Sequence, residues 1–258
     1  MSTTSTAAAA CTPATLKTHT SGVLTVATDS PAYEPWFVND KPSNGKGYES
    51  AVAFAVAKQL GYPADKVKWV VAAFNSVIAP TPKNFDFDIN EVSITPQRAK
   101  AVDFSAGYYD VAQSVVTLKS NKYAKATTIA QLKGARLGAQ KGTTSLDAIT
   151  GEIKPGTSPR EYPTNDLAVQ ALKNGSIDGL VVDLPTGLYV TAAQVEKSTI
   201  VGQLPSTGTP EQFGLVLDHG SSLTSCVSKA VDALRADGTL EQLRTKWLTN
   251  TAGAPELK

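Results

Sequence analysis

Arg98 is the residue whose type and position point most directly to ligand chemistry. It follows Thr95-Pro96-Gln97, and Thr is a good helix N-cap while Pro is favoured at the first helical position. Arg98 is therefore expected in the first turn of a short helix, where the helix dipole disfavours a cation unless an anion joins it. With unpaired backbone N–H groups beside it, Arg98 would bind a carboxylate or a phosphate. A surface arginine, or one paired with Asp103, is the alternative that these residues leave open.

Residues 138–145, GAQKGTTS, form a second candidate anion site. Gly142 allows the backbone to approach a ligand closely, and Thr143 and Thr144 stand at an expected helix start that offers unpaired N–H groups. The segment lacks the spacing of a Walker A phosphate loop. Many loops look like it, so it indicates anion binding only together with other residues.

Asp183 is the candidate for the opposite charge. It directly follows the apolar residues 180–182, and a carboxylate at the end of a strand could accept hydrogen bonds from an ammonium group. The alternative is that it caps the helix expected over 186–194. Together these residues match a zwitterion. Its carboxylate would bind Arg98, Thr143 and Thr144, and its ammonium group would bind Asp183.

The elements that must hold these residues alternate between strands and helices. Strands are expected over 22–28, 67–71, 111–118, 136–139, 160–162, 180–182, 200–204 and 212–216. Helices are expected over 48–60, 74–78, 128–132, from about 146, and over 166–173, 186–194, 222–236 and 239–248. This alternation predicts an α/β fold with mostly parallel sheets. The polar candidates fall where strands end, which is where ligands bind on open α/β sheets.

Length and composition restrict the function classes. The chain has 258 residues, of which 41% are hydrophobic and 18% charged, enough for two lobes of about 100–130 residues with a core each. A net charge of +1 without a basic run argues against nucleic-acid binding. No stretch reaches the roughly 18 apolar residues that a membrane span needs. His19 and His219 have no metal-ligand spacing with the cysteines, so neither a metal nor a cofactor is expected.

The first 20 residues and the two cysteines indicate whether the protein is exported to an oxidising compartment. Residues 1–20 lack the charged and Leu-rich regions of a signal peptide, so we expect a flexible tail, or a chain whose export signal has been removed. Cys11 and Cys226 are either two free cysteines or a disulfide, which would imply an oxidising compartment. The disulfide is favoured because the tail has little else to order it. Lipid attachment at Cys11 is a further alternative, although no hydrophobic run precedes it.

The order of motifs resembles one known family. The run Ser93–Arg98, followed by Val102-Asp103-Phe104-Ser105, resembles the signature of the polar amino-acid family of periplasmic-type solute-binding proteins of ABC importers. Other signatures of that family are similar to residues 26–36, 138–144, 177–183 and 232–248. The resemblance covers about residues 22–250, and the combined order is more specific than any one motif.

The resemblance implies a two-lobed clamp of the type II periplasmic-binding-protein kind. Its α/β fold would have two mixed, mostly parallel sheets joined by two crossover strands near 110–115 and 205–213. Lobe 1 would comprise residues 21–112 and 208–258, and lobe 2 residues 113–207. An amino acid would bind in the cleft between the lobes, which close over it. Such a protein acts as a monomer outside the cytoplasm, in the periplasm or anchored at the cell surface, and delivers its ligand to the membrane subunits of an ABC permease.

The resemblance also implies a role for each candidate residue. Arg98 would grip the α-carboxylate, together with the amide of Thr144 and the hydroxyl of Thr143 or Thr144. Asp183 would hold the α-ammonium, helped by Ser93.

The side-chain pocket would be walled by Tyr33 and Phe74, with Asp29 at its polar end. One departure from the family is that Asn90 and Glu91 stand where relatives have small residues. Glu91 could pair with a cationic ligand side chain, or could satisfy a backbone group or a lysine. A carboxylate-rich pocket would favour arginine, lysine or another polar nitrogenous ligand and reject aspartate and glutamate, because like charges in a desolvated cleft repel.

Two other classes compete with a transport protein. An enzyme like a cyclohexadienyl dehydratase could use Glu91 as a general acid or base if burial raised its pKa. The motifs have no nearby histidine, nucleophilic cysteine or metal set, so we expect a binding protein and no catalytic residues. The second competitor is the ligand-sensing domain of a receptor.

Overall fold

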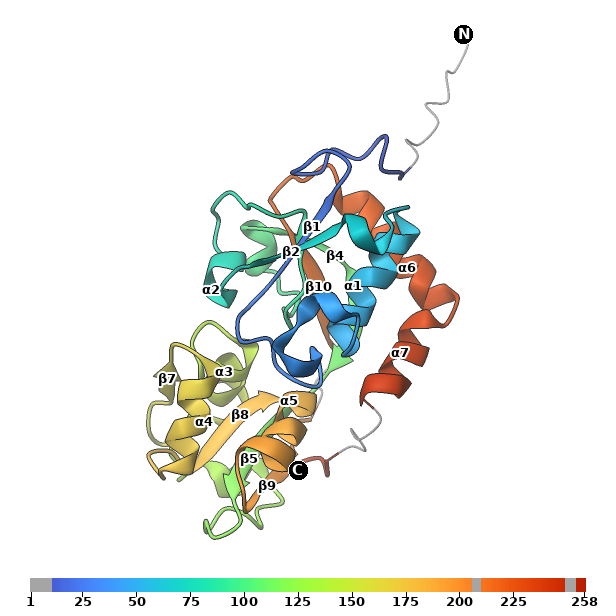
Figure 1. The fold of residues 1–258 in the computed structure, drawn as a ribbon. Coiled ribbons are helices and arrows are strands. Elements are labelled where there is room, and N and C mark those ends of the chain that lie inside the picture. Colours follow the sequence, from blue (N-terminus) through green and yellow to red (C-terminus); the bar gives the residue numbers. More distant parts are fainter. Residues whose placement is uncertain (1–10, 206–209, 249–253) are drawn as a thin grey trace. The chain divides into compact units, whose positions relative to one another are not determined.

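The computed structural model describes residues 11–205, 210–248 and 254–258 (Figure 1). The chain divides into two compact units. Unit 1 comprises Met1–Tyr109 and Phe213–Arg244, and unit 2 comprises Asp110–Gln212 and Thr245–Lys258. Each unit is described by itself below.

Unit 1 is built on a five-stranded sheet in the order β2-β1-β3-β10-β4. Its strands are β1 Leu24–Thr28, β2 Val67–Val71, β3 Phe87–Asp88, β4 Asp103–Val111 and β10 Glu211–Leu217. β1 runs parallel to β2 and β3, whereas β10 is antiparallel to β3. All five residues of β1 are buried, as expected for a strand covered on both faces.

Four α-helices accompany this sheet: α1 Tyr48–Gln59, α2 Phe74–Val77, α6 Thr224–Ala236 and α7 Thr239–Leu248, whose last four residues group with unit 2. The turns at Val38–Asp40, Pro42–Asn44, Ala64–Lys66 and Arg98–Lys100 are 3-10 helices. Helix α1 packs against α6. It ends before Gly61, whose φ of +81° is the left-handed conformation that stops a helix.

Unit 2 is built on a second five-stranded sheet, in the order β7-β6-β8-β5-β9. Its strands are β5 Gln113–Leu118, β6 Leu137–Gln140, β7 Arg160–Tyr162, β8 Gly179–Asp183 and β9 Ser198–Gln203. β6 is parallel to β7 and β8, and β5 is antiparallel to β8 and β9. Both sheets are therefore mixed, which confirms the expected fold class.

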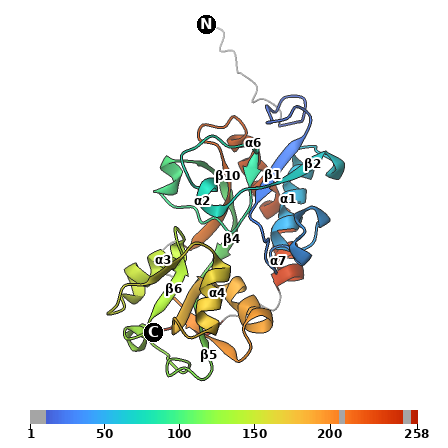
Figure 2. The same cartoon turned by 60° about the vertical axis from the view of Figure 1, so that its left-hand side comes forward.

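The helices of unit 2 are α3 Thr144–Ala148, α4 Asn165–Lys173 and α5 Leu184–Tyr189, with a 3-10 turn at Ile129–Leu132. π-helical turns at Ile149–Ile153 and Val190–Gln194 continue α3 and α5. Helix α4 contacts β5, β6, β7 and β8 and lies across this sheet (Figure 2). Thr164 is its N-cap and accepts a hydrogen bond from Leu167 N.

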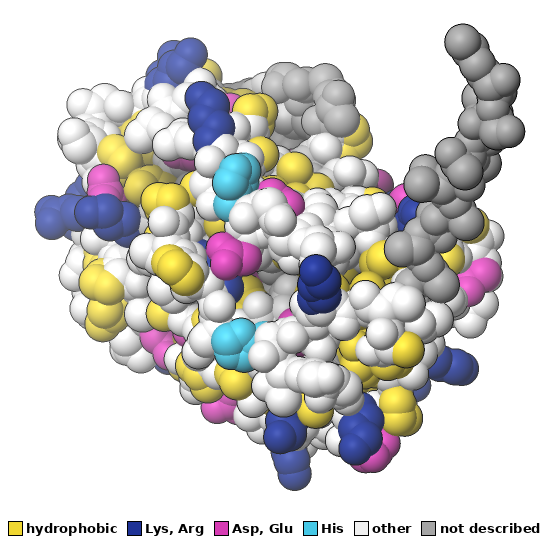
Figure 3. Space-filling view, turned by 90° about the horizontal axis from the view of Figure 1, so that it is seen from above, with side chains coloured by type: hydrophobic (Ala, Val, Ile, Leu, Met, Phe, Trp, Pro, Cys, Tyr) yellow, Lys and Arg dark blue, Asp and Glu magenta, His cyan; other side chains and the backbone are white. Residues whose placement is uncertain are grey.

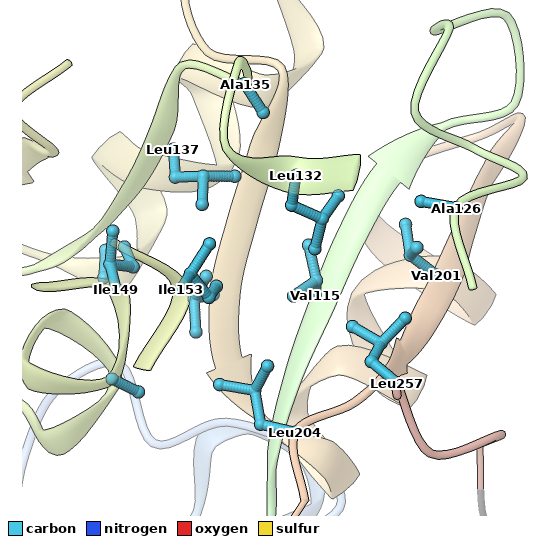
Figure 4. Packing of buried hydrophobic residues seen from close by; sticks show 13 residues of the cluster. Val115, Ala126, Leu132, Ala135, Leu137, Ile149, Ile153, Val201, Leu204 and Leu257 are labelled. Atoms are coloured by element: carbon cyan, nitrogen blue, oxygen red, sulfur yellow. The ribbon is translucent and has the colours of Figure 1, made fainter. Parts of the chain in front are cut away.

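The end of the chain completes the core of unit 2. Figure 4 shows Leu257 beside Val201 and Leu204 among the buried hydrophobic residues. Lys258 accepts a hydrogen bond from Ile129 N and donates one to the carbonyl of Thr127. These contacts belong to the segment Thr245–Lys258, which groups with unit 2.

The two boundaries between the units fall within strands, at residues 109/110 in β4 and 212/213 in β10. The expected lobe boundaries, after residue 112 and before residue 208, lie close to these positions. The expected lobe division otherwise stays a prediction.

Cys11 and Cys226 form a disulfide, which confirms the favoured alternative for the two cysteines. It joins the start of the described chain to α6. Asp86 fastens the same segment further on, because its carboxylate accepts from His19 N and Thr25 N, both at 2.6 Å. Of the expected flexible tail, residues 1–10 lie outside the described residues, and residues 11–20 are held by these contacts.

One face of the molecule carries Lys, Arg, Asp and Glu side chains interspersed, without a gathering of one sign (Figure 3). Within the described ranges, none of the helices has both the length and the apolar character that crossing a membrane requires.

Candidate functional site

Arg98 is buried in unit 1, with 8% of its surface exposed. Its Nη1 donates to the carbonyl of Ser93 at 2.7 Å, and its guanidinium carbon lies 5.4 Å from the centre of the Phe74 ring. An arginine over an aromatic face gains a cation–π interaction. The structure thus brings together three of the candidate residues: Arg98, Ser93 and Phe74.

The turn at Arg98 differs from the expected one. Arg98 begins a single 3-10 turn, and Thr95 accepts from Arg98 N through Oγ1 at 3.1 Å and from Ala99 N through its carbonyl at 2.9 Å. The expectation of unpaired N–H groups is therefore wrong for these two amides. The guanidinium of Arg98 is therefore the group to which the expected anion binding is assigned, and this role stays a prediction.

Asp103, the alternative partner of Arg98, has other contacts. Its carboxylate accepts from Gly220 N at 3.1 Å and from the hydroxyl of Thr224 at 2.8 Å. His219 Nδ1 lies 3.3 Å from the same carboxylate. Asp103 thus fastens the segment that leads into α6.

Asp29 and Phe74 are also adjacent. Asp29 follows β1, and its carboxylate accepts from Phe74 N at 3.4 Å and from Ser30 N at 2.8 Å. Tyr33 lies half-buried in the loop after β1, where its carbonyl accepts from Phe37 N at 2.8 Å. Asp29 therefore sits at the start of α2, next to the ring that contacts Arg98.

Glu91 and Asn90 lie in a strained segment. Glu91 has a φ of +51°, in the left-handed region that a non-glycine residue seldom adopts. Its amide donates to Glu49 Oε1 at 2.7 Å, which fixes that conformation. The Nδ2 atom of Asn90 is buried and makes no hydrogen bond in the structure, and such an atom costs free energy.

Glu49 was missed by the sequence reasoning. It is fully buried in α1 and accepts from the hydroxyl of Tyr108 as well as from Glu91 N. Burial raises the pKa of Glu49 to about 7, although both hydrogen bonds act to lower it. The available signal was a glutamate that shortly precedes the apolar run of residues 51–57.

Two candidate residues of unit 2, Thr144 and Asp183, contact Gln113, which the sequence reasoning also missed. Gln113 in β5 pairs directly with Asp183 in β8, and its Nε2 donates to Asp183 Oδ1 at 2.7 Å. The same nitrogen lies 3.1 Å from Glu211 Oε2 and 3.4 Å from the hydroxyl of Thr144. Asp183 holds the N-cap position of α5 but makes no side-chain cap bond, so the alternative of a helix cap is wrong.

Thr143 caps the start of helix α3. Gly142, with a φ of +80°, turns the chain from β6 into α3. Thr143 is the N-cap of α3; its hydroxyl accepts from Leu146 N at 3.3 Å and donates to the carbonyl of Gln140 at 2.7 Å. This geometry favours Thr144 over Thr143 as the hydroxyl available to a ligand.

No group of three or more His, Cys, Asp or Glu side chains is arranged to hold a metal ion among the described residues.

Comparison with known proteins gives a consistent result. A family model described as bacterial extracellular solute-binding proteins, family 3, matches residues 24–250. The L-cystine-binding protein TcyJ of Escherichia coli K12 is 28% identical over 83% of this chain and 79% of its own. The ABC transporter glutamine-binding protein GlnH of Bacillus subtilis is 29% identical over 80% of this chain and 75% of its own.

Solved structures agree with these relatives. An ancestral arginine-binding protein bound to glutamine superposes with a TM-score of 0.73 and 31% identity, over 88% of this chain and 97% of the other. An ancestral amino acid-binding protein, a precursor of cyclohexadienyl dehydratase, gives a TM-score of 0.70 and 30% identity over 88% and 95%.

Proposed function

The chain belongs to the bacterial extracellular solute-binding proteins, family 3, and from this premise we propose that it captures an amino acid and delivers it to an ABC importer. The observation that carries the proposal is the burial of Arg98 against Phe74 and Ser93. A guanidinium at this place can bind a ligand carboxylate through charge-assisted hydrogen bonds.

The α-carboxylate of the ligand binds Arg98. A guanidinium has five N–H donors in a planar fork, so Arg98 can hold the carbonyl of Ser93 and also bind a carboxylate. The amide and hydroxyl of Thr144 complete the carboxylate contacts. Thr143 contributes by fixing the start of α3.

The α-ammonium binds Asp183, with the hydroxyl of Ser93 as a further acceptor. The half-buried Asp183 carboxylate is held by Gln113 at 2.7 Å. An ammonium–carboxylate hydrogen bond is roughly twice as strong as a neutral one.

The ligand side chain lies against Tyr33 and Phe74 and meets the polar groups of Asp29, Asn90 and Glu91. Two carboxylates among these residues favour arginine, lysine or another polar nitrogenous amino acid. They disfavour aspartate and glutamate, because like charges in a desolvated site repel. Cystine, glutamine and arginine, named for the similar proteins, all fit this description.

The protein acts outside the cytoplasm, as a monomer that docks on the membrane subunits of an ABC permease. The Cys11–Cys226 disulfide supports that location, because disulfides persist in oxidising compartments.

A thermal-shift screen with the 20 common amino acids and L-cystine tests the proposal. A ligand present at 100 times its Kd should add about 2.7 kcal/mol to the free energy of unfolding. Arg98→Ala should weaken binding by about 100-fold or more, because it leaves a desolvated carboxylate without its partner. Arg160→Ala, which removes an exposed arginine of β7, is the matched control. The proposal fails if none of these amino acids stabilises the protein, or if both variants bind alike.

A binding protein is also favoured over an enzyme, because the named relatives are binding proteins. The similarity to a precursor of cyclohexadienyl dehydratase makes that activity the one to test. Turnover of prephenate-like acids by the purified protein, lost in Glu91→Gln, would overturn the choice.

A further inference from the structure

Glu49 contacts two segments of unit 1 that carry candidate ligand-binding residues. It is the second residue of α1 and is fully buried. Its amide donates to the carbonyl of Trp36 at 3.1 Å, in the loop that follows Tyr33. Its carboxylate accepts from Glu91 N at 2.7 Å. One residue thus joins the loop that carries Tyr33 to the segment that carries Asn90 and Glu91.

The loop after Tyr33 lies against the start of α1. The carbonyl groups of Pro35 and Trp36 accept hydrogen bonds from the first two amides of the helix, both at 3.1 Å. A Cβ atom on Gly47 would collide with the carbonyl of Trp36, so glycine at this position lets the loop approach the helix closely. Glu49 therefore has a fixed place relative to this loop.

The segment 89–92 is bonded at both ends and turned in its middle. Ile89 N donates to a carbonyl of β1, and the carbonyl of Val92 accepts from an amide of β10, each at 3.0 Å. Between these bonds Glu91 has a φ of +51°, which a residue with a side chain seldom adopts. Such a conformation persists only where the surrounding structure holds it. The Glu49 carboxylate does so, because it accepts from the amide of the turned residue.

Two tyrosines fix the Glu49 carboxylate in turn. The hydroxyl of Tyr108 in β4 donates to Oε1, the oxygen that also accepts from Glu91 N. The hydroxyl of Tyr48 donates to the carbonyl of Tyr108 at 2.8 Å. All three side chains are buried, so a movement of the carboxylate would leave desolvated donors without an acceptor.

We propose that Glu49 is a positioning residue: its carboxylate holds the left-handed turn, so that residues 90–91 face the ligand side chain from a fixed place relative to Tyr33. This inference rests on the proposed function, in which these residues contact the ligand side chain. Without the carboxylate the turn has other conformations. A ligand that binds one of several conformations binds more weakly in proportion to the population of that conformation.

Calorimetric titration tests the inference, with L-arginine, L-glutamine, L-cystine and every other amino acid that stabilises the protein in the thermal-shift screen. Glu49→Ala removes the acceptor, and Glu49→Asp keeps the charge but is one methylene too short to reach the amide. Each should weaken binding by about tenfold. Glu49→Gln keeps the length and a carbonyl acceptor, and its affinity should stay within about threefold of the unmodified protein.

Asp86→Asn is the matched control for simple destabilisation. Asp86 is a buried acid of the same unit that fastens the N-terminal segment, so the variant should lose stability and keep its affinity. If Glu49→Ala and Glu49→Asp bind as tightly as this control, the inference is wrong and the proposed function stands. If no amino acid binds the unmodified protein, both fail.

A double-variant cycle shows whether Glu49 acts through residue 91. Glycine adopts a positive φ without strain, so Glu91→Gly makes the turn less dependent on the Glu49 carboxylate. Combining it with Glu49→Ala should cost at least about fivefold less affinity than the product of the two single losses. Losses that simply multiply would refute the positioning role. Should Glu49→Ala fail to fold, the same cycle is measured with Glu49→Asp.

Discussion

Two buried acids of unit 1 and one half-buried acid of unit 2 behave in opposite ways. In unit 1, Glu49 and Asp88 are fully buried, and neither carboxylate oxygen of Asp88 makes a hydrogen bond in the structure. Burial raises the pKa of Glu49 to about 7 and that of Asp88 well above its usual range. In unit 2, Asp178 lies 2.8 Å from the guanidinium of Arg136 and also accepts from Asn121. The hydrogen bonds from Arg136 lower the pKa of Asp178 to about 2.

The difference shows that two neutral donors leave the pKa of buried Glu49 raised, whereas the guanidinium of Arg136 lowers the pKa of Asp178. Desolvation disfavours the charged form, whereas donors and cations favour it. The acids of unit 1 hold protons that the unfolded chain would release, so their stabilisation is lost as pH rises. Asp178 holds its charge to low pH, so its stabilisation is lost as pH falls.

The largest expected effect is the loss of stability when the disulfide that joins the two chain segments of unit 1 is removed. Replacing both cysteines, Cys11→Ser with Cys226→Ser, opens a covalent loop with a sequence separation of 215 residues. The chain-entropy model assigns such a loop about 5 kcal/mol. Urea unfolding of the oxidised protein and of the double variant measures the difference. Reductant should destabilise the unmodified protein only, and equal stabilities would contradict the prediction.

The second prediction concerns Glu49, which accepts hydrogen bonds from two donors of unit 1. Glu49→Ala leaves Glu91 N and the hydroxyl of Tyr108 without their acceptor, and it should destabilise the protein by about 3 kcal/mol. Glu49→Gln retains a carbonyl acceptor and should cost less. Thermal unfolding at pH 5 compares them, and a smaller loss for the alanine variant would refute this role for Glu49.

The third prediction concerns pH. Because the folded-state pKa of Glu49 is about 7 and its ordinary value 4.5, its contribution is full below pH 4.5 and is lost as pH rises to about 7. The loss is at most about 3 kcal/mol. Denaturant unfolding between pH 4.5 and 8 should show the decline, and Glu49→Gln should flatten it. An unchanged slope in that variant would assign the decline to other groups, such as Asp88.

The smallest expected effect concerns the ion pair between Asp178 and Arg136 in unit 2. Asp178→Asn removes the ion pair with Arg136, whose side chain is 49% exposed. Solvent screening keeps the contribution of such a pair to stability small. The unmodified protein should lose this contribution as pH falls from 3.8 towards 2, and the variant should not. Hydrogen exchange of residues 136–178 follows the loss, and identical acid profiles would remove the contrast between the units.

Sequence patterns predicted the fold better than the site. Strand–helix alternation and the stops at residues such as Gly61 are local signals, and they located most elements. The resemblance carried by Ser93–Arg98 indicated the family. Strand β4 was not expected, and the helix over 186–194 instead begins at Leu184 and becomes π-helical at Val190.

The sequence could not predict contacts between residues that lie far apart in the chain. Gln113 reads as an ordinary polar strand residue, and its contact with Glu211 spans 98 positions. Glu49 stands next to an apolar run, but the sequence does not reveal its two donors, which lie 42 and 59 positions away. Conversely, the roles of Arg98, Thr144 and Asp183 towards a ligand stay predictions.

The disulfide has a mechanical consequence. When the chain is pulled from its two ends, tension passes directly from Cys11 to Cys226 and bypasses everything between them. Only residues 1–11 and 226–258 can then straighten, to about 150 Å at roughly 3.5 Å per residue, against about 900 Å for the reduced chain. A single molecule held in optical tweezers would therefore report its oxidation state as a contour length.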